Sequence, residues 1–294
     1  MSRPLNIAIL MGGDSLEAEV SRASASEVAN ALDVGSHQTT LIEVDENLAL
    51  ELNALRPDVV FPALHGPPGE DGTVQGMLEM LQLPYVGSGV HGSAIAMDKG
   101  IAKIVFRHAG LPVADDVAIA AGTSPADAAA LVRDSLGERI VVKPSRQGSA
   151  IAITLLANGG DPQPALSEAL QLGRVLVEPY VEGREITVGV LDLYGQDPVP
   201  FPVIEIRTAP DEWYDYVNRY KVGGSEHIIP APLPDSVNIE LQRIALVAHE
   251  ALDLRDLSRA DFIVADDDTI TLLEVNTLPG MTPTSLYPDG ARAM

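Results

Sequence analysis

Short apolar runs alternate with helix-like segments through the first third of the chain. Residues 5–11 form an apolar run, and a helical pattern follows over residues 15–32. Two more strand-like runs lie at residues 38–44 and 58–64. Strands that are joined through helices lie parallel in one sheet with helices on its faces. We therefore expect an α/β domain with a parallel sheet over residues 1–98.

The rest of the chain reads as two further units, in which strands and helices are mixed less regularly. Residues 99–182 contain strand-like runs at 139–144 and 174–181, with helical segments between them. Residues 183–294 begin with another strand-like run and finish in a hairpin over 260–276. The expected fold is thus an α/β domain followed by two α+β units.

Charge and composition exclude several classes of function. The net charge is −23, which disfavours binding to nucleic acid or to an anionic membrane. No apolar run reaches the ~18–20 residues of a membrane span, and the apolar N-terminal stretch is too short for a signal peptide. There is no cysteine, so disulfides and thiolate metal sites are excluded, which fits a cytoplasmic protein. The lysines are few: Lys99, Lys103, Lys143 and Lys221.

The hairpin near the end of the chain carries polar side chains where a core is expected. Residues 260–276 read as two strands around a turn of aspartates. If Asp266 pairs with Thr269, counting outward along the strands places Asp261 opposite Glu274. We therefore expect two carboxylates to meet on one face of the sheet.

Asn276 follows Glu274 at a spacing of two, so both side chains point to the same face. Together with Asp261 they supply two carboxylates and one amide oxygen. Such an all-oxygen ligand set favours Mg²⁺, Mn²⁺ or Ca²⁺ over zinc. The alternative is a solvated strand end at which Asn276 caps a turn.

Lys99 and Lys143 stand beside strand ends and loops. Lys143 follows an apolar run and precedes a Gly/Ser loop, and Lys99 opens a predicted helix whose dipole favours anions. A lysine together with loop N–H groups suits phosphate oxygens, although the chain has no P-loop motif. Alone, either lysine could equally be a surface residue.

A strand break at Pro179 leaves backbone groups free around Glu178 and Val181. These groups could hydrogen-bond the edge of a planar ring, and Glu185 could accept hydrogen bonds from sugar hydroxyls. The alternative is a linker that carries ordinary surface acids.

Ten short segments stand out along the chain. They are GGDSLEAEVS (12–21), ALHGPPGEDGTVQGMLE (63–79), PYVGSG (84–89), MDK (97–99), VKPSRQGS (142–149), EGREITVGVL (182–191), WYDYVNRY (213–220), IPAP (229–232), RADF (259–262) and LLEVNTLPGMTPTSLYP (272–288). In content and order they resemble the D-alanine–D-alanine ligases of the ATP-grasp superfamily. No single segment is decisive, but ten in family order are very specific.

The resemblance implies a three-domain ATP-grasp architecture. Residues 1–98 would form the N-terminal domain, 99–182 the central ATP-grasp subdomain, and 183–294 the C-terminal subdomain with the metal and substrate site. It also implies ligation of two D-alanines with ATP, through a D-alanyl phosphate, for peptidoglycan precursor synthesis. A cytoplasmic homodimer that uses two Mg²⁺ ions, or Mn²⁺ in their place, is expected on the same ground.

The resemblance assigns the nucleotide and metal ligands residue by residue. The expected roles are phosphate binding for Lys99 and Lys143, adenine binding for Glu178 and the backbone near Val181, ribose binding for Glu185, and metal binding for Asp261, Glu274 and Asn276.

It assigns the amino-acid sites in the same way. Glu17 would bind the ammonium of the first D-alanine, with His65 near its carboxylate. Arg259 and the Gly280 N–H would form an oxyanion hole, and Ser285 with the Leu286 backbone would bind the carboxylate of the second D-alanine. Ser149 and Tyr220 would link Glu17 to the lid loop 207–230.

Two other functions stay open. One is a related ligase that uses D-lactate or D-serine as second substrate, although Tyr220 argues against D-lactate. The other is a nucleotide-binding homologue with weak or no ligase activity.

The sequence departs from the family pattern at four positions. Ala18 replaces a basic residue, Ala150 a hydroxyl-bearing residue, Ala152 a glycine and Arg219 a lysine. If the backbone at Ala152 has a positive φ, the substitution is costly. Relatives also continue past the SLYP segment into a C-terminal helix, whereas this sequence stops at Met294.

Overall fold

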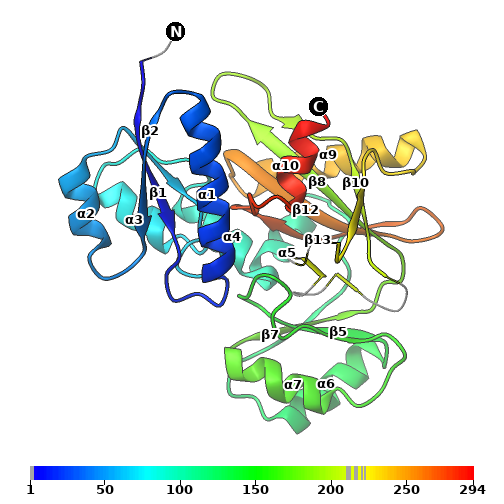
Figure 1. Cartoon of the computed structure of the whole chain (residues 1–294). Coiled ribbons are helices and arrows are strands. Elements are labelled where there is room, and N and C mark those ends of the chain that lie inside the picture. The colour runs from blue at the N-terminus through cyan, green and yellow to red at the C-terminus, as the bar shows by residue number, and fades with distance from the viewer. Residues whose placement is uncertain (1–2, 210–212, 215–217, 220, 222) are drawn as a thin grey trace.

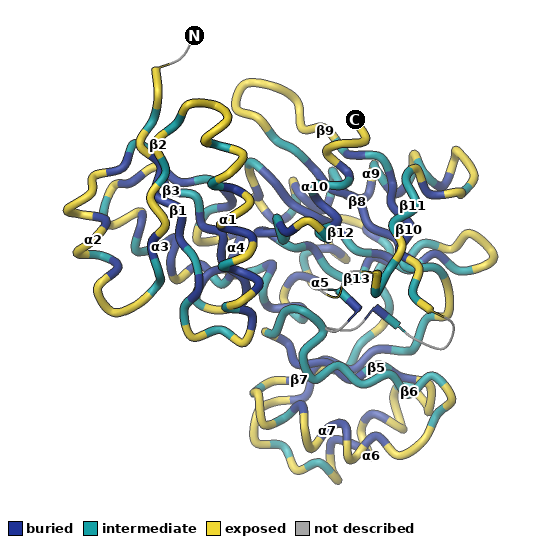
Figure 2. Tube along the Cα trace, viewed as in Figure 1, coloured by how far each residue is buried: buried dark blue, intermediate teal, exposed yellow. Residues whose placement is uncertain are grey.

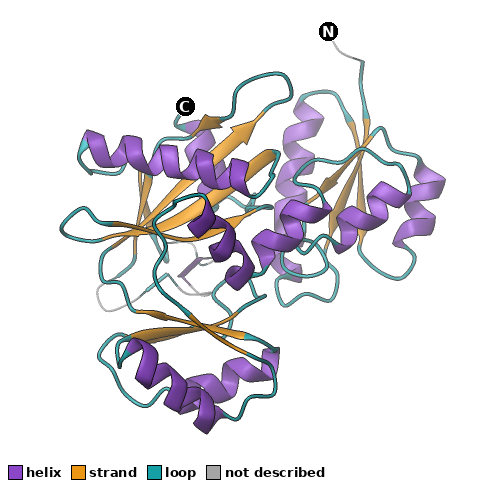
Figure 3. Cartoon of the chain, turned by 180° about the vertical axis from the view of Figure 1, so that it is seen from behind, coloured by secondary structure: helices purple, strands orange, loops and turns teal. Residues whose placement is uncertain are grey.

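The computed structural model describes residues 3–294 except 210–212, 215–217, 220 and 222. It contains three β-sheets, and helices pack on each of them (Figures 1 and 3). No described helix combines the length and the apolar character needed to cross a membrane. The mixed α/β class predicted from the sequence is confirmed.

The first sheet is parallel, as predicted, with strand order β2-β1-β3. Its strands and helices are β1 (Asn6–Met11), α1 (Ala18–Val34), β2 (Gln38–Glu43), α2 (Leu48–Leu55), β3 (Val59–Pro62) and α3 (Thr73–Met80). Ile7 and Ile9 of β1 pack toward α1, while Ala8 and Leu10 pack in the cluster that holds α2 and α3. Because both faces are covered, the strand reads as one continuous apolar run.

The four-stranded sheet has the order β4-β7-β5-β6, and all of its pairs are antiparallel. Its elements are β4 (Val117–Ile119), α6 (Pro125–Leu136), β5 (Ile140–Pro144), β6 (Thr154–Leu156), α7 (Gln163–Ala169), the 3-10 turn η1 (Leu170–Leu172) and β7 (Val175–Pro179). Helices α6 and α7 cover one face (Figure 1). The buried Val132 and Leu166 join them to the sheet.

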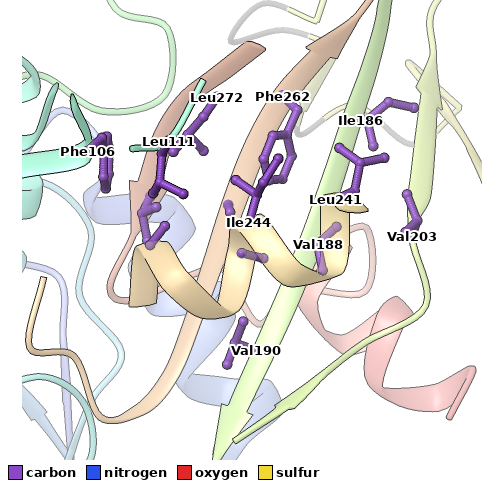
Figure 4. Close-up of a cluster of buried hydrophobic side chains, with 14 of the residues drawn as sticks. Phe106, Leu111, Ile186, Val188, Val190, Val203, Leu241, Ile244, Phe262 and Leu272 are labelled. Carbon is purple, nitrogen blue, oxygen red and sulfur yellow. The ribbon is translucent and has the colours of Figure 1, made fainter. Parts of the chain in front are cut away.

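The large sheet has the order β11-β10-β8-β12-β13, with β9 paired to β8. Its elements are β8 (Arg184–Asp192), β9 (Val199–Pro200), β10 (Ile204–Arg207), β11 (Glu226–Ile228), α9 (Asp235–Ala251), β12 (Asp256–Val264), β13 (Ile270–Asn276) and α10 (Leu286–Arg292). Ile186, Val188 and Phe262 pack against Leu241 and Ile244 of α9 (Figure 4). The burial pattern along the chain is shown in Figure 2.

The side chains between these core positions point to the opposite face of the large sheet, because strand residues alternate. Glu185 and Thr187 of β8 and Arg259 and Asp261 of β12 occupy that face, and Thr187 contacts Asp261. A single sheet thus carries a hydrophobic core on one side and charged residues on the other.

Helix α5 (Lys99–His108) follows α4 (Val90–Met97) and starts at the N-cap Asp98, whose side chain accepts from the Ile101 N–H. Phe106 of α5 is fully buried in the core shared with α9 and the large sheet. By packing, α5 therefore lies with the large sheet, although the sequence division groups residue 99 with the central unit.

The turn of the closing hairpin contradicts one predicted pairing. The Ala265 N–H donates to the Thr269 carbonyl at 2.9 Å, so Thr269 faces Ala265 rather than Asp266. The turn is one residue longer than expected, because Asp268 takes a positive φ of 64° at its end.

A β-bulge farther along the same hairpin corrects the register. Asp261 pairs with Glu274 as predicted, because Leu273 is an extra residue in β13. The bulge explains why Leu272 and Val275, three residues apart, both reach the core. Leu273 and Glu274 both line the cavity on the other face.

Candidate active site

A cavity of about 170 Å³ lies between the four-stranded sheet and the large sheet. Val141, Leu155 and Ile263 give it apolar walls, and Lys143 and Glu185 add charge. An apolar slot with a charged end suits a purine nucleotide. The predicted nucleotide residues Lys143, Glu178, Val181 and Glu185 all line this cavity.

Glu178 is a buried carboxylate on β7 that pairs with two lysines. Its Oε1 accepts from Lys103 and its Oε2 pairs with Lys143. Burial opposes ionisation, but the attraction of Lys143 and Lys103 outweighs it and lowers the pKa of Glu178. The reading of Glu178 as an ordinary surface acid is therefore wrong.

Lys99 is also buried, so it is not a surface residue. Its Nζ lies 3.1 Å from Glu274 Oε2 and donates to the Gln147 carbonyl at 2.7 Å. Burial opposes ionisation of Glu274, but Lys99 and Lys143 attract the carboxylate and lower its pKa to about 2. Lys99, Glu274 and Asn276 line a common pocket.

The three predicted metal ligands meet on the site face of the hairpin. Asp261 pairs with Glu274 across the strands and accepts from Asn276 Nδ2 at 3.1 Å. Arg259 donates to both carboxylate oxygens of Asp261, at 2.8 and 2.7 Å. Asn276 therefore bonds a carboxylate across the strands rather than capping a turn.

Among the described residues, no cluster of three or more His, Cys, Asp or Glu could hold a metal ion. The predicted set contains two carboxylates and one amide, all with oxygen donors. It fits a hard cation such as Mg²⁺, which takes few protein ligands and completes its shell with water and phosphate oxygens.

A second, smaller pocket of about 40 Å³ adjoins these residues. It brings together six of the predicted residues: Glu17, His65, Ser149, Arg259, Asn276 and Gly280. Its volume and charge suit one small zwitterion rather than a large ligand.

Glu17 is buried at the start of α1 and accepts a hydrogen bond from Ser149 Oγ. Burial raises the pKa of Glu17, although the Ser149 hydrogen bond and Arg219 oppose the shift. Gly148 lies so close that a Cβ there would stand 2.9 Å from Glu17 Oε2. A side chain at position 148 would therefore push the carboxylate out of place.

A third pocket, also of about 40 Å³, contains Ser285 and Leu286. It shares Arg259 and Gly280 with the second pocket. The structure thus brings together all the predicted site residues that it describes, whereas Tyr220 lies outside the described residues.

Arg219, which lies in the predicted lid loop where relatives have a lysine, lines the 170 Å³ cavity and both small pockets. Its guanidinium stacks on the Tyr214 ring at 4.5 Å from the centroid, and its Nε donates to the Tyr214 carbonyl at 3.1 Å. The planar guanidinium suits this stacking better than an ammonium group would.

Sequence reasoning did not assign Glu70, Thr187 or Lys103. Glu70 lines two of the pockets and accepts from the Gly66 N–H at 2.7 Å, and burial raises its pKa. Thr187 Oγ1 donates to Asp261 Oδ1 at 2.6 Å. The spacing of four between Lys99 and Lys103 places them on one helix face, and that was a usable signal.

We expect His65 to make stability depend on pH. Burial lowers the pKa of His65 to about 4, so the folded protein binds fewer protons than the unfolded chain between pH 4 and 6.5. Stability contributed by neutral His65 is present above pH 6.5 and is lost as pH falls, by up to about 3 kcal/mol. Urea unfolding of wild type and His65→Gln should show a steeper acid loss in wild type. Parallel profiles would contradict this assignment.

Ala150 and Ala152 have positive φ angles of 59° and 53°. The backbone strain expected where Ala152 replaces the family's glycine is therefore present. We expect Ala152→Gly to raise the free energy of unfolding by about 0.5 kcal/mol, because relief of about 1 kcal/mol of strain exceeds the added freedom of the unfolded chain. The same change at the exposed Ala130 inside α6 should lower it by about 1 kcal/mol. Chemical denaturation of both variants measures the difference, and two losses of equal size would refute the strain.

Comparison with known proteins gives a consistent result. The family model described as "D-ala D-ala ligase C-terminus" matches residues 105–294, and "D-ala D-ala ligase N-terminus" matches residues 47–88. The D-alanine–D-alanine ligase of Methylobacterium radiotolerans is 43% identical over 97% of this chain and 92% of its own length. The D-alanine–D-alanine ligase of Parvibaculum lavamentivorans is 44% identical over 98% of this chain and 92% of its own length.

Solved structures agree with these matches. The Bacillus anthracis D-alanine–D-alanine ligase complexed with ATP superposes with a TM-score of 0.82 at 32% identity, and covers 98% of this chain and 91% of its own. The Coxiella burnetii D-alanine–D-alanine ligase gives a TM-score of 0.82 at 28% identity, and covers 99% of this chain and 90% of its own.

Proposed function

Because the chain belongs to the D-alanine–D-alanine ligase family, we propose that it joins two D-alanines with ATP to form D-alanyl-D-alanine for peptidoglycan precursors. One observation carries the proposal beyond family membership. The nucleotide cavity and the two small pockets share walls, with Arg219 common to all three. A phosphoryl donor and two small amino acids can therefore meet at one place.

In the proposed first step, the carboxylate of the first D-alanine attacks the γ-phosphorus of ATP, ADP leaves, and an acyl phosphate forms. Glu17 would hold the ammonium of this substrate, while Lys99 and Lys143 would contact phosphate oxygens. When bound, Mg²⁺ on Asp261, Glu274 and Asn276 would neutralise phosphate charge during the transfer.

In the second step, the neutral amine of the second D-alanine attacks the acyl carbon. Arg259 and the Gly280 N–H would stabilise the tetrahedral oxyanion. The carbon–oxygen bond to phosphate then breaks, and inorganic phosphate leaves with the proton that the nitrogen gives up. Ser285 and the Leu286 backbone would fix the carboxylate of the second D-alanine. The pocket that holds Ser285 also contains Arg259 and Gly280, which supports placing the second D-alanine beside the proposed oxyanion hole.

The decisive experiment follows phosphate release from Mg·ATP together with product mass. D-alanine should trigger release and yield D-alanyl-D-alanine, whereas L-alanine should not. Release with a mixed product from D-alanine plus D-lactate or D-serine would point to the related ligase. Binding of ATP by the folded chain without release on any substrate would reject ligase activity.

We also propose the division into residues 1–98, 99–182 and 183–294, a homodimer formed through the first of these, and a cytoplasmic location. Their support is the family resemblance and the separate sheets. Sedimentation velocity of the whole chain tests the dimer, and a monomer at micromolar concentration would reject it.

A further inference from the structure

Lys103 is a buried lysine to which the proposed reaction gives no role. It lies on α5, one turn after Lys99, and its side chain is 1% exposed. A lysine that is buried to this degree requires a charged partner, because an isolated ammonium is unstable away from water.

The partner is Glu178, whose two carboxylate oxygens contact different lysines. Lys103 donates to Oε1, and Lys143 pairs with Oε2. On its other side Lys103 lies 3.6 Å from Asp116, which Arg107 also holds. Glu178 therefore pairs with both Lys103 and Lys143, whereas Asp116 already pairs with Arg107.

The two lysines differ in what they can reach. Lys143 and Glu178 line the nucleotide cavity, whereas Lys103 does not. The charge of Lys143 also acts on Glu274, which lines the same cavity. Lys143 can therefore turn from Glu178 toward phosphate oxygens, while Lys103 is confined between α5 and β7 behind the carboxylate.

We propose that Lys103 is a positioning residue for the nucleotide: it is the standing counterion of Glu178, and so it releases Lys143 to bind the phosphates. The inference rests on the proposed function, since it takes the cavity to bind ATP. Without Lys103, any movement of Lys143 to phosphate leaves an unpaired carboxylate inside the protein, which is strongly unfavourable. Glu178 then retains Lys143, and the phosphates lose a cation.

The test measures dissociation constants for ATP and for adenosine by displacement of a fluorescent nucleotide, without turnover. The dissociation constant for adenosine divided by that for ATP isolates the contribution of the phosphates, because the base and the sugar are common to both. In Lys103→Met this ratio should fall at least about 10-fold, the size of one charge-assisted contact. Equal weakening of ATP and adenosine would show a merely structural role and overturn the proposal.

Two further variants make the result specific. Arg243→Met removes a cation from the exposed pair with Glu240 on α9, apart from Glu178 and Asp116, and its ratio should match wild type. Glu178→Gln removes the carboxylate that competes for Lys143, so Lys103→Met should have no effect on the ratio in that background. A fall of about 10-fold in the double variant, relative to Glu178→Gln, would overturn the proposal even if Lys103→Met alone did not fold.

The outcomes separate this proposal from the proposed function. A wild-type chain that binds ATP far better than adenosine but shows no D-alanine-dependent phosphate release rejects the ligase, while the variants still decide the role of Lys103. A wild-type chain that binds ATP and adenosine equally rejects the role of Lys143, and with it this proposal.

Discussion

Glu274→Gln is expected to lower the turnover number for D-alanyl-D-alanine synthesis by about 1,000-fold, which corresponds to roughly 4 kcal/mol of lost transition-state stabilisation. The change keeps the shape of the side chain and removes a negative charge that lies 3.1 Å from Lys99 Nζ. In the proposed reaction that carboxylate would help to hold Mg²⁺, which would neutralise phosphate charge. Coupled measurement of phosphate release at saturating D-alanine and Mg·ATP gives the number.

The fold should survive this substitution. The pKa of Glu274 is about 2, below the ordinary value of 4.5, so its ionised form contributes stability above pH 4.5 that is lost as pH falls through 2. Removing the charge therefore costs at most about 3 kcal/mol at neutral pH. Glu240→Gln, in the exposed pair with Arg243, is the matched control and should change neither rate nor stability. Turnover of Glu274→Gln within 10-fold of wild type would contradict the metal role.

Arg259→Met should impair both activity and stability. Loss of an oxyanion donor lowers turnover by about 100- to 1,000-fold. The substitution also strips Asp261 of the guanidinium that contacts both of its oxygens, and breaking such a buried pair costs about 3–5 kcal/mol. Urea unfolding and steady-state kinetics measure the two losses separately.

A double variant isolates the effect of Arg259 on stability. In Arg259→Met/Asp261→Asn the unpaired carboxylate is gone, so unfolding should return to within about 2 kcal/mol of wild type while turnover stays low. Arg243→Met, which removes the same group from an exposed pair, should change stability by less than about 1 kcal/mol. Recovery of turnover in the double variant would rule out an oxyanion role for Arg259.

Periodicity predicted the parts of the fold whose burial is regular. Strand β1 appeared as a continuous apolar run because Ile9 faces α1 while Leu10 faces the opposite layer. The short strands β9 and β10 were missed, and β11 lies in a segment that was read as a polar loop. The three residues of β11, Glu226–Ile228, are exposed or half-buried, so their sequence carries no apolar signal. Helix α10 was not predicted, and two of its residues, Pro288 and Gly290, are poor helix formers.

Site residues on strands were predictable as a pair, although the reasoning was partly wrong. Asp261 faces Glu274 because two one-residue effects cancel, a longer turn and the bulge at Leu273. Neither effect is visible in the sequence, since the count from Asp266 gives the same pair without them. The double pairing of Glu178 was not predictable, because Lys103 and Lys143 are 40 residues apart in the chain and only the fold brings them together.

The bulge at Leu273 also determines which changes in turn length this hairpin can accept while Asp261 still faces Glu274. Because the strands re-register at the bulge, the site end of β12 and β13 is offset by one residue from the register that the turn sets. A relative whose turn is one residue shorter needs no bulge to bring the same two carboxylates together, and one with the longer turn needs it. A change in the length of the β12–β13 turn must therefore be accompanied by gain or loss of the bulge residue if the two carboxylates are to stay paired.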